Sequence, residues 1–509
     1  MNDYLLGVDY GTGGAKAAII DTAGNVLAYS FREYEIISPQ PGWSEHDPHR
    51  YWAAFCEMVP ECIAEAGIHP EDVRGLAVSS ALPCLVMVDR DGNPINNAYN
   101  LMDRRATAEV QFIKDTIGER RIFEVSANRL DDHPALVNLM WEKNNRPKDF
   151  ERIHKALTIE GYIVYRLTGE FSLVHSNAAF YGVAYNVVER TFDRGILRAI
   201  GIDPDILPSL YDCVDIVGPV TKKAAGETAL APNTPVAAGQ ADFNAACVAS
   251  GLVEDGDIQS NLGTAGNFGI VHKDTNFMYE MIAFGFTVSA KDTYITVPTT
   301  TTGGMAVRYF RDRFADSERE AERLTGVDAY DLLNQQAARI PAGSERLIVL
   351  PFLMGERTPI WDVYARGVVF GLSLNHTKGH VVRATMEGVA YAMYDSFRLM
   401  QDAGKKMNLP LIMHEGGAKS TLWRQIITDV FNVPTVLTKR RTGAPFGDAV
   451  LAGVATGVLE DFSVAKEWAQ YIDEMQPNPS NHELYMRYFE VFKSIYNGVK
   501  HQYRELYAL

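Results

Sequence analysis

A glycine-rich turn near the start of the chain holds the first residues whose types and spacing suit chemistry. The segment 7–16 reads GVDYGTGGAK. Backbone N–H groups in such a turn can approach a phosphate, a threonine hydroxyl adds a donor, and a lysine adds a cation. Asp9 precedes the turn and suits hydrated Mg²⁺, which usually takes one or two carboxylates together with phosphate oxygens. The candidate phosphate ligands are Gly11, Thr12, Gly13, Gly14 and Lys16.

This turn lacks the GxxxxGK[ST] spacing of a Walker A loop, and it leads into an apolar run that predicts a strand. An ordinary hairpin turn is therefore the alternative. A second turn of the same kind, GTAG, lies at 263–266, with Gly263, Thr264 and Gly266 as candidate ligands. Two such turns would hold a polyphosphate from two sides, unless the second is a remnant of duplication that contacts no ligand.

A single carboxylate, Asp242, follows the apolar run 235–238 and begins a helix-like run of small residues. A carboxylate at this position can cap the helix by accepting from its free N–H groups. It can also act as the general base that deprotonates a substrate hydroxyl. We predict the general base, with the helix cap as the alternative.

A third glycine-containing segment follows the apolar run 411–414 and precedes the amphipathic pattern 422–431. Its residues Gly416, Gly417 and Ala418 allow a flat adenine ring to pack closely against the backbone at a helix start. A pair of glycines is a weak signal by itself, and a plain turn is the alternative.

The elements that must position these residues occur twice in the same order. Apolar runs at 4–9 and 15–20 predict a hairpin, and 26–34 extends it to a three-strand meander. The runs 257–262 and 267–272 repeat the strand, turn and strand. The first half also predicts a helix from Pro48 to Ala66, capped by Asp47, and the region from 460 to the end has a helical pattern.

This repetition predicts an α/β fold with two related domains, one at 1–252 and one at 253–509. The length of 509 residues and the hydrophobic share of 47% suit chains that fold by burial, and they exclude disordered and collagen-like classes. The net charge of −16 disfavours nucleic-acid binding. The five scattered cysteines contain no CxxC pair, which fits a reducing cytoplasm and argues against a thiolate metal site.

Taken in order, these motifs resemble the FGGY family of carbohydrate kinases. The resemblance covers nearly the whole chain, and further anchors lie between and beyond the turns. These anchors are PGWSEHDP at 41–48, DRR at 103–105, YRLTGE at 165–170, GERTP at 355–359, residues 367–372, EGV at 387–389 and residues 443–448.

The resemblance implies two duplicated ribonuclease H-like, actin-like domains with a cleft between them, and an ATP-dependent kinase that acts on a sugar. It implies that Asp242 is the catalytic base, that Asp9 lies at Mg²⁺ and the phosphates, and that Lys16 meets the transferred phosphate. It also implies that the turn at 263–266 holds nucleotide phosphates and that the segment at 416–418 receives the adenosine.

The sugar pocket departs from the family pattern. Xylulokinases place Met-His and glycerol kinases place Arg-Glu where this chain has Leu82-Pro83. Asp103 is retained as the expected pocket carboxylate, with Arg105 as its partner or as a cation that admits a sugar acid. His133 is a further candidate for the pocket, although a single histidine is more often structural.

We expect xylulose as the first substrate among ketopentoses and related open-chain sugars. L-xylulose, ribulose, glycerol, other polyols and ketoses, and a 3-keto sugar acid are the alternatives within the kinase class. From other classes, a phosphatase-like enzyme and a non-catalytic Hsp70-like ATP-binding protein are considered. The expected partners are the sugar and ATP, with no nucleic acid and no membrane, and a homodimer is left open.

Overall fold

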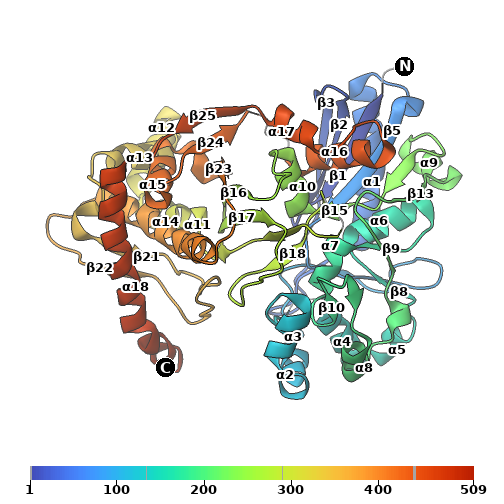
Figure 1. Cartoon of the computed structure of the whole chain (residues 1–509), viewed down its shortest axis with the longest axis horizontal. Coiled ribbons are helices and arrows are strands. Elements are labelled where there is room, and N and C mark those ends of the chain that lie inside the picture. Colours follow the sequence, from blue (N-terminus) through green and yellow to red (C-terminus); the bar gives the residue numbers. More distant parts are fainter. Residues whose placement is uncertain (1–2, 133–134, 289–290, 440–442) are drawn as a thin grey trace. The chain divides into compact units, whose positions relative to one another are not determined.

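The structure is a computed structural model, and it describes residues 3–132, 135–288, 291–439 and 443–509. Its internal contacts divide the chain into two compact units, which the rainbow colours of Figure 1 help to trace. Unit 1 comprises Met1–Glu254, Lys273–Ile295 and Arg440–Gln470. Unit 2 comprises Asp255–His272, Thr296–Lys439 and Tyr471–Leu509.

A mixed sheet forms the centre of unit 1. Its strand order is β13 (Ile216–Pro219), β14 (Pro235–Ala237), β5 (Val73–Ser80), β1 (Tyr4–Tyr10), β2 (Gly14–Asp21) and β3 (Val26–Glu33), and β15 (Gln240–Ala241) also pairs with β5. The strands β1, β2 and β3 pair antiparallel, which confirms the predicted meander, whereas β1 and β5 pair in parallel. Asp21 closes the second turn by accepting from the backbone N–H groups of Ala23 and Asn25.

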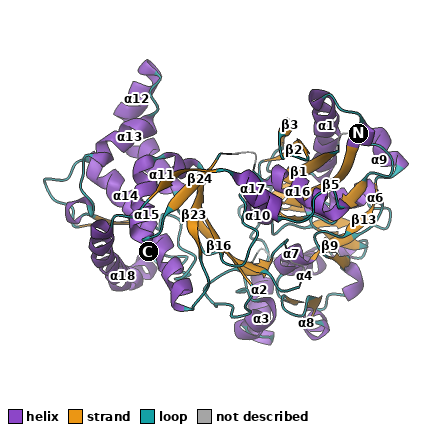
Figure 2. Cartoon of the chain, turned by 45° about the horizontal axis from the view of Figure 1, so that its top comes forward, coloured by secondary structure: helices purple, strands orange, loops and turns teal. Residues whose placement is uncertain are grey.

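Unit 1 also contains helices, most of which are labelled in Figures 1 and 2. They are α1 (Pro48–Ala66), α2 (Thr107–Thr116), α3 (Glu119–Ser126), α4 (Ala135–Asn145), α5 (Pro147–Phe150), α6 (Ile159–Thr168), α7 (His175–Ala178), α8 (Arg194–Ile200), α9 (Lys222–Thr228), α10 (Asp242–Ala249), α16 (Ala444–Thr456) and α17 (Ser463–Ala469). As predicted, Asp47 caps α1 by accepting from the His49 N–H at 2.9 Å. The helix α1 packs against β2 and β3, and α16 packs against β1 and β5.

The side chains of β1 alternate between the two sides of the sheet. Leu6 and Val8 are fully buried in the core cluster that includes the α1 side chains Phe55 and Met58. Asp9 has the opposite parity, so it shares a face with Gly7, where α16 approaches the strand. The strand therefore delivers a carboxylate to the face that α16 covers.

Unit 1 also contains shorter strands. They are β4 (Glu45–His46), β6 (Val86–Val88), β7 (Ala98–Tyr99), β8 (Lys155–Leu157), β9 (Ser172–Val174), β10 (Tyr185–Asn186), β11 (Thr191–Phe192), β12 (Ser209–Tyr211) and β18 (Ala283–Gly285), and β19 (Tyr294–Thr296) lies where the chain passes to unit 2.

Unit 2 repeats the strand pattern of unit 1. Its strands are β16 (Asp257–Leu262), β17 (Gly266–His272), β20 (Thr299–Thr300), β21 (Ile348–Leu350), β22 (Val368–Phe370), β23 (Asn408–His414), β24 (Thr435–Thr438) and β25 (Tyr471–Met475). β16 and β17 form an antiparallel hairpin, and β16 pairs in parallel with β23, just as β1 pairs with β2 and β5. The predicted second hairpin is confirmed.

The helices of unit 2 are α11 (Gly304–Phe314), α12 (Asp316–Thr325), α13 (Ala329–Ala338), α14 (Lys378–Asp402), α15 (Thr421–Phe431) and α18 (Pro479–Tyr507). The predicted helical pattern after residue 460 is wrong at Tyr471–Met475, where β25 pairs antiparallel with β24. In α18, Tyr485, Phe489 and Phe492 are buried, so the aromatic stripe packs into the core as expected. None of the helices in the described ranges has the length and apolar character that crossing a membrane requires.

Candidate functional site

The carboxyl ends of three strands bring together the chemical groups of unit 1. Asp9 is near the end of β1, Ser79 and Ser80 end β5, and Asp242 directly follows β15. β5 pairs in parallel with both other strands, so Asp9 and Gln240 each lie opposite Ser79. Parallel strands present their carboxyl ends at one edge, which is where open α/β sheets bind ligands.

Asp9 is 2% exposed and lies between a cation and a hydroxyl. Its Oδ2 accepts from the Lys16 Nζ at 3.1 Å, and its Oδ1 accepts from the Ser79 Oγ at 3.2 Å. Burial raises the pKa of Asp9 above its ordinary value, although Lys16 acts in the opposite direction. The Lys16 side chain is 38% exposed, so its ammonium group remains accessible to a ligand.

Asp242 is the first residue of α10 and is partly buried. Burial, followed by repulsion from Asp9, raises the pKa of Asp242 from 3.8 to about 7. A carboxyl with a pKa near the working pH suits a general base. The capping position of α10 is held by Ala241, and the Asp242 Oδ1 accepts from the adjacent Phe243 N–H at 2.7 Å.

The first glycine-rich turn joins β1 to β2, as expected from the sequence. The Gly11 N–H donates to the Gly14 carbonyl at 3.0 Å, and the Tyr34 hydroxyl donates to the Gly11 carbonyl. A Cβ at Gly14 would lie 2.6 Å from the Arg32 carbonyl oxygen, which explains why this position needs glycine. A Cβ at Gly13 would meet open space, so β3 does not crowd the tip of the turn.

Unit 2 contains a cavity of about 420 Å³ that is lined by the two remaining glycine-rich segments. Gly263 and Thr264 line it from the turn between β16 and β17, and Gly416 and Gly417 line it from the segment before α15. The other predicted residues adjoin these: Gly266 begins β17, and Ala418 is buried at 3% exposure. The side chains that complete the lining include Met305, Arg308, Tyr330, Asp331, Asn334, Met386, Lys419 and Trp423.

The close approach of backbones shapes this cavity. A Cβ at Gly417 would lie 2.5 Å from the Leu262 side chain, so a larger residue would push into the wall. The Gly303 N–H donates to the Thr264 carbonyl at 2.9 Å, and a Cβ at Gly303 would overlap the Ala265–Gly266 backbone. Gly303 was not among the residues predicted for the site, and the paired glycines before α11 were the signal that could have indicated it.

Two of the residues predicted for the sugar pocket, Asp103 and Arg105, belong to a buried ion-pair network. The Arg105 Nε donates to the Asp103 Oδ1 at 2.8 Å, and its NH2 group donates to the Asp103 Oδ2 and the Glu45 Oε1, both at 2.7 Å. The guanidinium also lies over the rings of Trp43 and Tyr99, at 4.0 and 3.7 Å from their centroids. This agrees with the expectation that Asp103 is the partner of Arg105.

Asp103 is fully buried, and each of its oxygens accepts two hydrogen bonds. Besides the Arg105 side chain, Oδ1 accepts from the Arg105 N–H at 3.1 Å and Oδ2 from the Ser44 N–H at 2.8 Å. Direct contact of Asp103 with a sugar stays a prediction, and it would compete with these four bonds. Leu82 packs against the core of unit 1, Pro83 is buried, and His133 lies outside the described residues.

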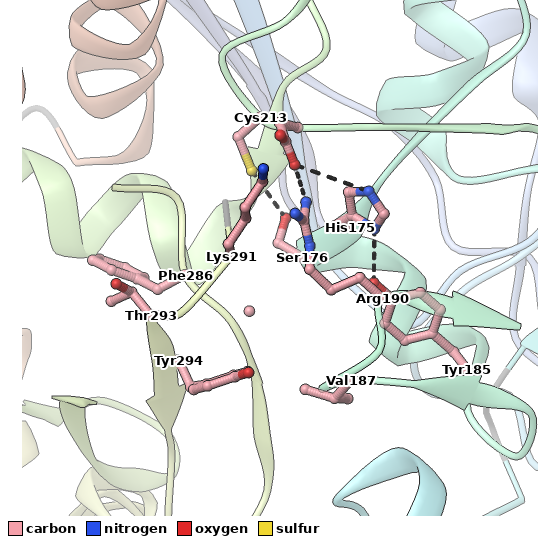
Figure 3. A pocket seen from close by; sticks show the side chains of 12 residues that line it. His175, Ser176, Tyr185, Val187, Arg190, Cys213, Phe286, Lys291, Thr293 and Tyr294 are labelled. Carbon is pink, nitrogen blue, oxygen red and sulfur yellow. Dashed lines mark hydrogen bonds and ion pairs between the residues drawn. The ribbon is translucent and has the colours of Figure 1, made fainter. Parts of the chain in front are cut away.

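A second, much smaller cavity lies in unit 1 around His175, Arg190, Asp212 and Tyr294 (Figure 3). Its volume of about 20 Å³ is close to the minimum that holds one water molecule. Arg190 pairs with Asp212, and the His175 Nδ1 lies 2.9 Å from the Tyr185 hydroxyl. The size of this cavity excludes it as a sugar or nucleotide site in this structure.

The residues present fit a magnesium ion that is held mainly by phosphate oxygens and water. Asp9 supplies a buried carboxylate beside further acidic groups, and hard oxygen ligands are what Mg²⁺ prefers. In the ranges that the structure describes, no three His, Cys, Asp or Glu side chains gather as a metal cluster. Asp9 is the residue that would hold such an ion beside the phosphates.

Comparisons with known proteins identify the family of this chain. The N-terminal domain model of the FGGY family of carbohydrate kinases matches residues 4–249, and the C-terminal domain model matches residues 260–456. The "Xylulose kinase" of Bacillus subtilis (strain 168) is 28% identical over 500 residues, covering 98% of this chain and 97% of its own. The "Gluconokinase" of the same organism is 26% identical over 510 residues, covering 99% and 98%.

Among solved structures, xylulose kinase from Rhodospirillum rubrum is 26% identical with a TM-score of 0.91, covering 98% of this chain and 100% of its own. The chain belongs to the FGGY family of carbohydrate kinases. It is an ATP-dependent phosphotransferase that acts on a sugar, and the predicted fold class is confirmed. The alternatives of a phosphatase-like enzyme and an Hsp70-like binding protein gain no support, since both domain models are those of kinases.

Proposed function

We propose that this kinase transfers the γ-phosphoryl group of ATP to a hydroxyl of a neutral ketopentose, with xylulose as its first substrate. The nucleotide binds through the unit 2 cavity, with Gly263 and Thr264 at the phosphates and Gly416 and Gly417 at the adenosine. The turn at 11–14 and Lys16 meet the transferred phosphate. The names of the xylulose kinase relatives support this substrate, and a gluconokinase relative leaves a sugar acid as the alternative.

The pairing of Arg105 is the observation that favours a neutral sugar. A sugar acid requires an available cation, and an arginine fork is the group best suited to a carboxylate. Here the guanidinium is 0% exposed and already faces two carboxylates, those of Asp103 and Glu45. Its charge is thus balanced within the protein, and we infer that the DRR segment supports the pocket rather than attracting an anion.

The acid–base step belongs to Asp242 in this proposal. Its carboxylate takes the proton of the sugar hydroxyl as the sugar oxygen bonds to the γ-phosphorus and the bond from that phosphorus to the ADP oxygen breaks. A pKa near 7 leaves a substantial deprotonated fraction at neutral pH and makes the group a better base than an ordinary aspartate. Lys16 offsets negative charge on the transferred group, and Mg²⁺ at Asp9 would neutralise phosphate charge.

A substrate panel with a coupled ADP-release assay tests the proposal. The panel contains D-xylulose, L-xylulose, D-ribulose, glycerol and gluconate, each with and without ATP. We expect the highest kcat/KM for a xylulose and at least about tenfold less for gluconate, because a missing charge partner commonly costs about 1.4 kcal/mol or more. Preferential phosphorylation of gluconate would overturn the neutral-sugar assignment.

A further inference from the structure

One buried carboxyl beside the site has no part in the proposed chemistry. Asp448 is fully buried on α16. This helix lies in Arg440–Gln470, the last of the three segments that make up unit 1. Its Oδ2 accepts from the Ser79 Oγ at 2.7 Å, and its Oδ1 accepts from the Gln240 Nε2 at 2.8 Å. A buried carboxyl is costly unless it is hydrogen-bonded, and these two bonds provide that compensation.

The two hydrogen-bond partners of Asp448 are each connected to one of the two carboxylates of the proposed chemistry. Ser79 also lies 3.2 Å from the Asp9 Oδ1. Gln240 is on β15, two residues before Asp242, and it pairs with Ser79 across β5 and β15. One side chain on α16 therefore contacts β15, which directly precedes Asp242, and β5, whose Ser79 hydroxyl bonds to Asp9 on the neighbouring strand β1.

Both polar atoms of the Gln240 side-chain amide are hydrogen-bonded. Its Oε1 accepts from the Thr287 Oγ1 at 2.7 Å, so its amide is oriented between Thr287 and Asp448. Gln240 is 0% exposed. A fully bonded, buried amide has little freedom to rotate, which fixes the backbone immediately before the base.

Two glycines allow α16 to approach closely enough for these bonds. A Cβ at Gly7 of β1 would overlap the Pro445 carbonyl of α16. A Cβ at Gly447, next to Asp448, would overlap the Ala245 carbonyl of α10. The helix that carries Asp448 is thus held tightly against both the strand of Asp9 and the helix that begins at Asp242.

We propose that Asp448 is a positioning residue that fixes Asp9 and Asp242 relative to each other through Ser79 and Gln240. This inference rests on the roles proposed above for Asp9 and Asp242. Ser79 has a single hydroxyl hydrogen and faces two carboxyls, so it donates fully to Asp9 only when Asp448 does not also require that hydrogen. Burial raises the pKa of Asp448 well above its ordinary value. A protonated Asp448 would donate to the Ser79 oxygen and leave the Ser79 hydrogen to Asp9.

The test compares Asp448→Asn with Asp448→Ala in the full-length enzyme. An asparagine can accept from Gln240 and donate to Ser79, so both contacts are kept and we expect its kcat to stay within about threefold of the parent. An alanine removes the acceptor of the Gln240 Nε2 group and breaks the link between Gln240 and Ser79, although Ser79 still bonds to Asp9 and Gln240 to Thr287. We expect kcat to fall about 10- to 100-fold, because small misplacements of reacting groups have effects of that size. KM for sugar and for ATP should change by less than about threefold in both variants.

Asp429 provides a matched control in unit 2. It is 2% exposed and accepts from the Gln425 Nε2, the Asn478 N–H and the Asn481 Nδ2 at 2.7 to 2.9 Å, which ties α15 to the start of α18. Asp429→Ala should lower the Tm, as we also expect for Asp448→Ala, while leaving kcat unchanged. The contrast separates loss of positioning from loss of stability.

Ser79→Ala keeps the inference testable if Asp448→Ala does not fold. It removes the hydroxyl that joins Asp448 to Asp9, so it should lower kcat, and Ser79→Ala combined with Asp448→Asn should be no worse than Ser79→Ala alone. An unchanged kcat in Asp448→Ala or Ser79→Ala, or an Asp448→Asn defect as large as that of alanine, overturns the proposal. If Asp242→Asn also retains full kcat, the proposed function fails first.

Discussion

Replacing Asp242 by asparagine should make the protein more stable and much less active. The pKa of this carboxyl is raised from 3.8 to about 7, mainly by burial and then by repulsion from Asp9. The unfolded chain therefore loses this proton at a lower pH than the folded protein, and the ionised group destabilises the fold increasingly as pH rises from about 4 to 7. Asparagine keeps the shape and cannot ionise.

The expected gain follows from the size of the shift. Each pKa unit corresponds to about 1.4 kcal/mol, so the full shift amounts to about 4 kcal/mol above pH 7 and about 1.5 kcal/mol at pH 5. Because Asp242 is partly exposed, solvent screening reduces both values, and a gain of about 2 to 4 kcal/mol at pH 8 is reasonable. In a chain of this size this is a rise in Tm of several degrees.

Calorimetry of the ligand-free parent and Asp242→Asn proteins at pH 5 and pH 8 measures this effect, and the same samples provide kcat. We expect a larger gain in Tm at pH 8 than at pH 5, together with a loss of about 10² to 10⁴ in kcat while nucleotide still binds. A variant that is less stable than the parent at pH 8, or equally stabilised at both pH values, would refute the electrostatic reasoning. Retained kcat would refute the assignment of the base.

Three further substitutions probe other parts of the site. Lys16→Met should lower kcat by about 10²-fold or more with little change in the KM for sugar, because its charge acts on the transferred group; an effect on sugar KM alone would contradict this role. Gly417→Val pushes a side chain into the wall of the unit 2 cavity and should raise the KM for ATP at least about tenfold while sparing the sugar KM; direct titration with ATP checks the binding loss. Asp103→Asn should raise the KM for sugar more than that for ATP, since it disturbs Arg105 and the pocket around it; equal changes in both constants would remove Asp103 from the sugar side.

The two hairpins were predictable because their signal is local. Glycines flank apolar runs of strand length at both places, and the side chains alternate between two buried faces, so pattern alone specifies strand, turn and strand. The position of Asp242 between a strand and a helix was predictable in the same way, since it stands where an apolar run gives way to small residues. These predictions needed no knowledge of distant segments.

The features that were missed depend on exposure or on distant contacts. The strand β25 is exposed along most of its length, so it lacks the alternation that marks a half-buried strand. Asn334 reaches the unit 2 cavity through a hydrogen bond with Ser420, 86 positions away in the chain. The link from Asp448 to Ser79 spans 369 positions, and no window of sequence reveals such a pair.

The placement of α16 has a consequence for how the protein is made. The face of β1 and β5 that this helix covers is synthesised within the first 80 residues, whereas the covering helix begins at Ala444. During translation this sheet face therefore stays uncovered until most of the chain has left the ribosome. Such a nascent chain offers a long-lived binding surface to chaperones, and a message cut short before the codon for Ala444 should yield aggregated product rather than a folded first unit.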